Sequence, residues 1–167
     1  RILTHLGLEV VSLKSCGDFP EPVEDADSFM GNARIKALAA HKNTGLAAIA
    51  DDSGLIVDAL NGAPGVYSSR YAGEDATDAD NNAKLLRELA EVPAGQRTAR
   101  YACAIVFVDE DGTELEAFGT CEGSIGYEAA GQGGFGYDPY FLSADYPGQT
   151  LAEVDADAKD AISHRGK

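Results

Sequence analysis

The feature that most limits the possible folds of this chain is a pair of strand-like segments. The stretch TARYACAIVFVDEDGTELEAFGTCEG begins at Thr98 and holds two such runs, joined by acidic turn residues that end at Gly112. This pattern predicts a β-hairpin. The chain has 167 residues, of which 44% are hydrophobic, and this suits one domain or two lobes that share a core.

Two segments upstream of the hairpin have the periodicity of amphipathic helices. The first, SFMGNARIKALAAHKNTG, is predicted to end at Gly45, and the second, DADNNAKLLRELAEV, to be capped by Asp78. Their buried faces are predicted to contain Ile35, Leu38 and Ala39 in the first helix and Leu85, Leu86 and Leu89 in the second. A last helix is expected to begin near Asp155.

Short apolar runs between these segments predict further strands. We expect strands over 8–13, 46–50 and 55–60, and irregular structure in the glycine-dense stretch AAGQGGFGYDPYF. Strands and helices mixed in this order indicate an α/β or α+β protein.

The charge of the chain narrows its range of partners. It has 28 acidic and 13 basic residues, a net charge of −15, and so lacks the basic surface that binding to nucleic acids or anionic membranes requires. No apolar run approaches the ~20 residues of a membrane span. An acidic protein can still act on phosphates when a divalent metal ion lies between them.

The three cysteines form no disulfide or zinc pattern, which is typical of a cytoplasmic protein.

Two adjacent carboxylates, Asp51 and Asp52, lie between two of the predicted strands. At a strand end both side chains can approach one cavity, whereas within a strand neighbouring side chains point to opposite faces. A solvated turn is the alternative, because Asp, Ser and Gly are turn residues. The apolar runs on both sides place the pair at the edge of the core, and we therefore favour a functional site.

A second candidate site is the stretch GQGGFGYDPYF. Glycine lets a backbone approach a ligand closely, and an aromatic ring such as Phe135 is a natural stacking surface for a nucleotide base. A tight turn that carries core aromatic residues is the alternative. Near the C-terminus, Lys159 precedes the pair His164 and Arg165, which by itself is a weak signal.

Four stretches together resemble the inosine triphosphate pyrophosphatase family: SFMGNARIKA, ADDSGLIVDALNGAPGVYSSRYAGEDATD, GGFGYDPYF and AISHRG. The resemblance covers nearly the whole chain. It implies Mg²⁺-dependent hydrolysis of non-standard purine nucleoside triphosphates (ITP, dITP, XTP) by a cytoplasmic homodimer. The implied fold is an elongated two-lobed α/β structure, in which helices flank a long mixed β-sheet and a nucleotide cleft lies between the lobes.

The resemblance also implies roles for individual residues. Asp52 matches the general base, and together with Glu24 and Asp51 it matches the carboxylates at the Mg²⁺ site. The other matches are to substrate-binding residues, namely Ser53, Lys36, the base-binding loop Phe135, Gly136, Tyr137 and Asp138, and the purine-reading residues Lys159, His164 and Arg165. In the implied mechanism Asp52 deprotonates a water that attacks the α-phosphorus. The products are a nucleoside monophosphate and pyrophosphate.

Two departures from the family pattern bear on these expectations. Gly31 lies where many members carry an acidic residue, and no T-x-N-x-x-K phosphate loop is present near Arg1. We therefore expect a single domain over residues 1–167 that lacks the phosphate-loop strand and the end of the last helix. Two alternatives stay open: a non-catalytic nucleotide-binding or dimerisation protein, and a related pyrophosphatase with another base preference.

Overall fold

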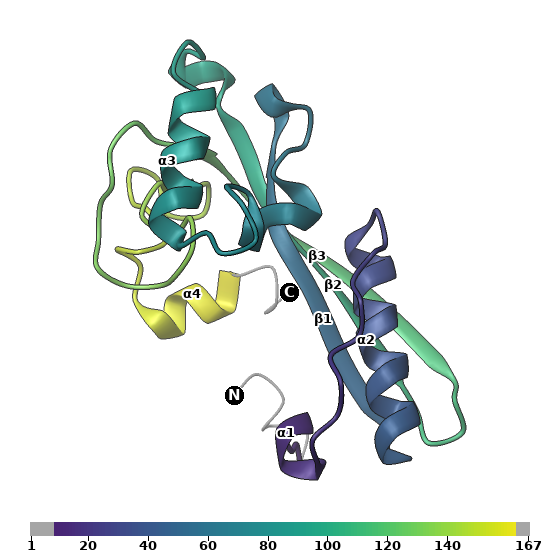
Figure 1. The fold of residues 1–167 in the computed structure, drawn as a ribbon. Coiled ribbons are helices and arrows are strands. Elements are labelled where there is room, and N and C mark those ends of the chain that lie inside the picture. The colour runs from purple at the N-terminus through teal and green to yellow at the C-terminus, as the bar shows by residue number, and fades with distance from the viewer. Residues whose placement is uncertain (1–8, 163–167) are drawn as a thin grey trace. The chain divides into compact units, whose positions relative to one another are not determined.

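The computed structural model describes residues 9–162 (Figure 1). The helices and strands follow in the order α1 Leu13–Cys16, α2 Phe29–Thr44, β1 Ala48–Val57, α3 Asp78–Glu88, β2 Thr98–Val108, β3 Glu114–Ile125, β4 Phe141–Ser143 and α4 Ala156–Ile162. Short 3₁₀ helices lie between them at η2 Asp58–Leu60, η3 Gly65–Arg70 and η4 Ala94–Gln96. Within residues 9–162 no helix combines the length and the apolar character that crossing a bilayer requires. The predicted mixture of helices and strands is confirmed.

The strands form one sheet in the order β1-β2-β3-β4. β2 and β3 form the predicted hairpin, and its turn is closed by the Gly112 N–H, which donates to the Asp109 carbonyl oxygen at 3.0 Å. β4 pairs antiparallel with the end of β3, where Gly123 lies opposite Ser143. A Cβ on Gly123 would lie 2.2 Å from the Leu142 carbonyl oxygen, and the close pairing therefore requires glycine.

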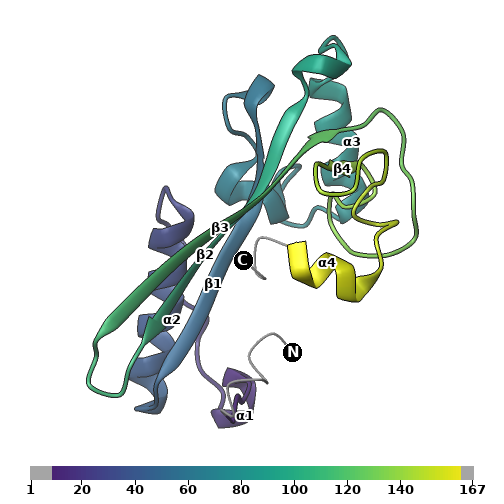
Figure 2. The same ribbon diagram turned by 180° about the vertical axis from the view of Figure 1, so that it is seen from behind.

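The chain divides into two compact units. The first unit comprises residues 1–52 and 104–118, and the second comprises residues 53–103 and 119–167. Within the first unit α2 lies beside the strands (Figure 2). Ion pairs join this helix to the sheet, from Arg34 to Glu114 of β3 and from Lys36 to Asp52 of β1.

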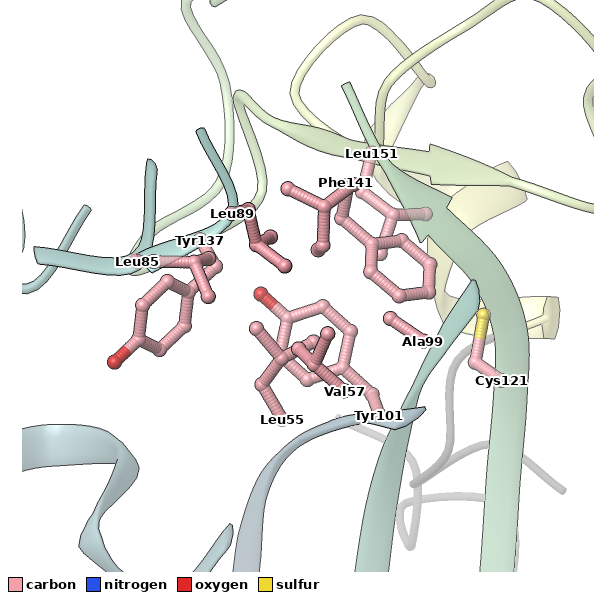
Figure 3. Close-up of a cluster of buried hydrophobic side chains, with 11 residues drawn as sticks. Leu55, Val57, Leu85, Leu89, Ala99, Tyr101, Cys121, Tyr137, Phe141 and Leu151 are labelled. Carbon is pink, nitrogen blue, oxygen red and sulfur yellow. The ribbon is translucent and has the colours of Figure 1, made fainter. Parts of the chain in front are cut away.

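The second unit has a well-defined hydrophobic core (Figure 3). Its buried members are Leu55, Val57, Leu85, Leu89, Ala99, Tyr101, Cys121, Ile125, Tyr137, Phe141 and Leu151. The rings of Tyr101 and Phe141 lie 4.8 Å apart, centroid to centroid. The predicted inner face of α3 is confirmed, because Leu85 and Leu89 are fully buried and Leu86 packs against the same cluster.

A buried arginine fixes the C-terminal end of α3. Arg97 is only 2% exposed, and its guanidinium donates hydrogen bonds to the carbonyl oxygens of Leu89, Val92 and Gly126. The guanidinium also lies 3.8 Å from the ring centroid of Tyr127. The last carbonyl groups of a helix have no partner within the helix. Arg97 therefore adds a charged donor to carbonyl oxygens at and beyond the end of α3.

Four local predictions are wrong. The apolar face predicted for α2 is not its buried face, because Leu38 is 39% exposed whereas Ala33 and Ala37 are fully buried. The two strands expected on either side of the aspartate pair are one continuous strand, β1, followed by the 3₁₀ helix η2. The strand expected over 8–13 is absent from the described residues: 9–12 are exposed and unpaired with the sheet, and α1 begins at Leu13. The cap of α3 is Thr77 rather than Asp78, because Thr77 and Asp80 satisfy each other's backbone N–H groups in a capping box.

Candidate functional site

The first candidate site is a cluster of charged side chains in the first unit. Ser28 caps α2, and Asn32 and Lys36 follow on this helix, one turn apart and therefore on the same face. The Lys36 Nζ atom lies 2.8 Å from Oδ1 of Asp52 and 3.1 Å from Oε2 of Glu24. Two carboxylates from separate segments of the chain thus converge on one cation.

A tight turn before α2 holds Asn32 in this cluster. The Ala26 N–H donates to Oδ1 of Asn32 at 3.0 Å, and the Nδ2 group of Asn32 points to Oδ2 of Asp52 at 3.5 Å. A Cβ on Gly31 would lie 2.6 Å from that of Ala26, which explains the glycine that departs from the family pattern. Sequence analysis missed Asn32, although its spacing of one turn from Lys36 is a signal that could have found it.

Burial and charge set the protonation of this cluster. Burial lowers the pKa of Lys36, but hydrogen bonds to Asp52 and Glu24 outweigh burial, and the pKa is raised overall. Lys36 therefore stays charged. Burial raises the pKa of Asp52, and the hydrogen bond from Lys36 offsets this only in part. Asp52 is consequently more basic than an ordinary aspartate, which suits a group that must accept a proton near neutral pH.

Two carboxylates of this cluster, Glu24 and Asp52, could contribute ligands to a divalent cation. Glu24 and Asp52 already share one positive charge, the Lys36 ammonium. Mg²⁺ in phosphate sites takes one or two carboxylates and completes its shell with phosphate oxygens and waters. Between residues 9 and 162 no group of three or more His, Cys, Asp or Glu side chains could hold a metal ion. Bound phosphates would therefore have to supply part of the shell.

Asp51 and Ser53 lie on either side of Asp52 in β1, and all three side chains are half-buried. The aspartate pair therefore lies within a continuous strand, and its expected position at a strand end is wrong. The strand accommodates the charge of Asp52 because Lys36 and Asn32 bind its carboxylate.

The second candidate site is a loop of the second unit, residues 131–138, which we call the Phe135 loop. Oδ2 of Asp138 accepts hydrogen bonds from the Phe135 N–H, at 2.8 Å, and from the Lys159 ammonium. The Lys159 Nζ atom lies 5.1 Å from the ring centroid of Phe135, and this ring is 64% exposed. The loop thus presents an exposed aromatic face beside a fixed hydrogen-bond donor.

The glycines of the Phe135 loop serve the packing of the loop itself. Gly134 has a φ of +74°, and a Cβ there would lie 2.1 Å from Oδ2 of Asp138. Gly131 has a φ of +85°, and its Cβ would lie 2.4 Å from the carbonyl carbon of Ala152. Both positions exclude side chains for conformational and steric reasons.

The other predicted residues of this region differ in their surroundings. Tyr137 is 4% exposed, belongs to the core in Figure 3, and donates through its hydroxyl to the Ser68 carbonyl oxygen at 2.7 Å. Asp138 is 2% exposed. Burial favours a positioning role for both side chains over direct contact with a ligand. His164 and Arg165 lie outside the described residues.

Carboxylates that converge on a cation, and an exposed ring beside an ammonium, suit an α/β protein that handles nucleotides. The chain belongs to the Ham1 family, whose sequence profile matches residues 1–167. It is 52% identical over 167 residues to a Desulforamulus reducens protein named dITP/XTP pyrophosphatase, and the match covers 100% of this chain and 83% of that protein. A Shigella flexneri protein of the same name is 51% identical over 169 residues, with 99% and 84% covered.

Solved structures are similar over almost the whole chain. A HAM1 protein from Coxiella burnetii matches with a TM-score of 0.87 at 43% identity, covering 99% of this chain and 84% of that one. A structure from Mycobacterium abscessus, titled nucleoside-triphosphatase and dITP/XTP pyrophosphatase, matches with a TM-score of 0.83 at 45% identity, covering 99% and 85%. The family resemblance and the α/β fold class predicted from the sequence are confirmed.

Proposed function

We propose that this chain hydrolyses non-standard purine nucleoside triphosphates, such as dITP and XTP, to the nucleoside monophosphate and pyrophosphate. The convergence of Glu24 and Asp52 on Lys36 carries the proposal. It occurs in a chain that is 52% identical to a relative named dITP/XTP pyrophosphatase.

The charged cluster serves the phosphate end of the substrate. Asp52 accepts a proton from the water that attacks the α-phosphorus, and Asn32 holds the carboxylate in position. Glu24 and Asp52 would hold Mg²⁺, with Asp51 as a further proposed ligand from the family resemblance. When bound, this ion neutralises charge on the phosphates and on the leaving pyrophosphate. Lys36 adds a fixed positive charge at the same place, and Ser53 is proposed to contact the substrate.

The Phe135 loop serves the base. The exposed ring of Phe135 stacks on the purine, and Lys159, held by buried Asp138, donates to the purine 6-position. Inosine and xanthosine carry a carbonyl acceptor there, whereas adenine carries an amino donor. A site built around such hydrogen bonds can discriminate by roughly 10⁴-fold. We assign His164 and Arg165 to the same task on the family resemblance alone.

Hydrolysis in ¹⁸O-labelled water tests this proposal. The purified chain should release pyrophosphate from dITP, XTP and ITP when Mg²⁺ is present and should cease to do so with excess EDTA. Attack at the α-phosphorus places the label in the nucleoside monophosphate, whereas label in pyrophosphate would contradict the assigned mechanism. Faster hydrolysis of dTTP or UTP would instead support a different base preference. Nucleotide binding without any hydrolysis would support a non-catalytic protein.

We also propose that the protein is a cytoplasmic homodimer. Several large apolar side chains of the first unit are exposed, among them Val10, Val11, Leu46, Ile49, Leu115 and Phe118. Exposed apolar side chains of this size are typical of a surface that a partner covers where they adjoin one another. Cys16, Cys103 and Cys121 are thiols, which is consistent with a reducing compartment. Sedimentation equilibrium of the purified protein should give twice the mass of the chain; a monomer at micromolar concentration would contradict the dimer.

A further inference from the structure

The N-terminal turn of α3 binds the backbone of the Phe135 loop. Oδ2 of Asp78 accepts a hydrogen bond from the Gly136 N–H at 2.7 Å. Nδ2 of Asn82 donates to the Gly136 carbonyl oxygen at 2.8 Å. Both backbone polar groups of one residue, the neighbour of Phe135, are thus held by two side chains that lie one turn apart on a helix.

The capping of α3 leaves the Asp78 carboxylate available for this contact. Thr77 and Asp80 form the capping box, and so Asp78 is the first residue of the helix instead of its cap. A carboxylate at a helix N-terminus is favoured by the positive end of the helix dipole. The Asp78 carboxylate therefore lies where the helix favours an acceptor, and it accepts from the Gly136 N–H.

Asn82 makes these contacts at a cost to stability. Its side chain is 8% exposed, and its Oδ1 atom is buried without a hydrogen-bond partner among the described residues. Its Nδ2 group donates both to Gly136 and to the Asp78 carbonyl oxygen. A leucine would fill the same space without a buried unpaired acceptor. The asparagine is therefore explained by its amide donors, one of which holds the Phe135 loop.

We propose that Asp78 and Asn82 are positioning residues for base recognition. Gly136 has a φ of +60°, a conformation that few residues favour and that reverses the chain directly after Phe135. By fixing both polar groups of Gly136, the two side chains fix the direction of the Phe135 ring above Lys159. The role of these residues in base recognition rests on the proposed function, whereas their contacts with Gly136 do not.

A fluorescence experiment tests the positioning without any nucleotide. The chain contains no tryptophan, and so the variant F135W carries a single indole reporter in the loop. We expect the anisotropy of Trp fluorescence to fall when N82L is added to F135W. N81L is the matched control: Asn81 is also buried, but its side chain accepts from the Ala72 N–H and donates to the Ser69 carbonyl oxygen instead of binding the backbone of the Phe135 loop.

Kinetics then test the role in recognition. N82L in the chain with native Phe135 should raise KM for ITP by about two- to tenfold, the loss expected for one hydrogen bond, with a smaller change in kcat. Hydrolysis of inorganic triphosphate, which has no base, should not change. N81L should change neither KM nor kcat for ITP.

Variants of Asp78 keep the inference testable if N82L folds poorly. D78A should lower the anisotropy of the Trp reporter and raise KM for ITP. D78N keeps an acceptor oxygen for the Gly136 N–H and should restore both the anisotropy and KM. Unchanged anisotropy in N82L and D78A, or an equal fall in N81L, would overturn the inference. A chain that hydrolyses no triphosphate would refute the proposed function, while the anisotropy would still decide the positioning role.

Discussion

The Nζ atom of Lys36 on α2 lies 2.8 Å from Oδ1 of Asp52 in β1. This contact holds the carboxylate that we assign as the general base. D52N keeps the size of the side chain but removes its basicity. We expect turnover of ITP to fall by roughly 10²–10⁴. The measurement is pyrophosphate release under saturating ITP and Mg²⁺, and near-normal turnover in the pure variant would refute the assignment.

Glu24 provides a test of the metal proposal. E24Q removes one of the two carboxylates that converge on Lys36. The Mg²⁺ concentration for half-maximal rate should rise by about tenfold or more, as expected for the loss of one charged interaction. Mn²⁺ binding followed by EPR in the absence of nucleotide should weaken in parallel. The control is E114Q, because Glu114 pairs with Arg34 elsewhere along α2. Equal effects in both variants would mean that the net charge of the protein, and not Glu24 itself, determines the metal affinity.

Phe135 tests the stacking proposal. F135A should weaken nucleotide binding by about 1–3 kcal/mol, the usual value for a base stacked on an aromatic ring. Hydrolysis of inorganic triphosphate should not change. Y67A is a matched control, since Tyr67 is also exposed, at 59% against 64% for Phe135, but lies in η3. If binding of base-free triphosphate falls as much as binding of ITP, the variant has disrupted the loop.

The raised pKa of Asp52 predicts how stability depends on pH. Burial is its main cause, so folding favours the neutral carboxyl. That contribution is present below the ordinary aspartate pKa and is lost as pH rises through the folded-state pKa. The melting temperature of D52N should therefore rise relative to wild type between about pH 4 and pH 7.

Asp58 provides a control, because its pKa is shifted in the opposite direction from that of Asp52. Hydrogen bonds from Thr98 and then Arg100 lower the pKa of Asp58. Its contribution is present above the ordinary aspartate pKa and is lost as pH falls through the folded-state pKa. D58N should therefore lose stability relative to wild type as pH rises through the range below about pH 4, and the difference should change little between about pH 4 and pH 7. Parallel pH profiles for the two variants would contradict the burial of Asp52.

Replacement of Arg97, which has no role in the proposed site, is expected to reduce stability strongly. R97M leaves the carbonyl oxygens of Leu89, Val92 and Gly126 without their charged donor. The free energy of unfolding in urea should fall by more than about 3 kcal/mol. R97K should recover only part of this loss, because an ammonium cannot reproduce the geometry of the guanidinium. R87A, at an exposed position of α3, should have little effect.

Local patterns were sufficient to predict most helices and the hairpin. The helix α2 was predicted with its end at Gly45, which has a left-handed φ of +70°, but its buried face was not predicted, since Leu38 is exposed. The turn at Gly112 was predicted because acidic and glycine residues interrupt two apolar runs. The cap of α3 was misassigned because Thr77 and Asp78 both suit that position. Only the reciprocal contact with Asp80 distinguishes them.

Contacts between distant segments explain what sequence analysis did not predict. Two adjacent aspartates inside a strand are unfavourable by local propensity, but Lys36 and Asn32 of another element bind Asp52 and allow β1 to continue. Glu24 and Lys36 were identified by family resemblance alone, whereas the position of Asp52 between two apolar runs already indicated a functional site. The contacts of Gly136 with Asp78 and Asn82 join residues 58 and 54 positions apart, and no local pattern indicates such pairs.

Because position 134 has no room for a side chain, only some variants of the Phe135 loop can be used to change the base preference of this enzyme family. Even an alanine there would place a carbon 2.1 Å from the Asp138 oxygen that holds Lys159 and the Phe135 backbone. Randomising the loop to obtain new base preferences would therefore yield mostly misfolded clones. A library that keeps the glycines and Asp138, and varies Phe135 together with Lys159, should retain far more folded members to select from.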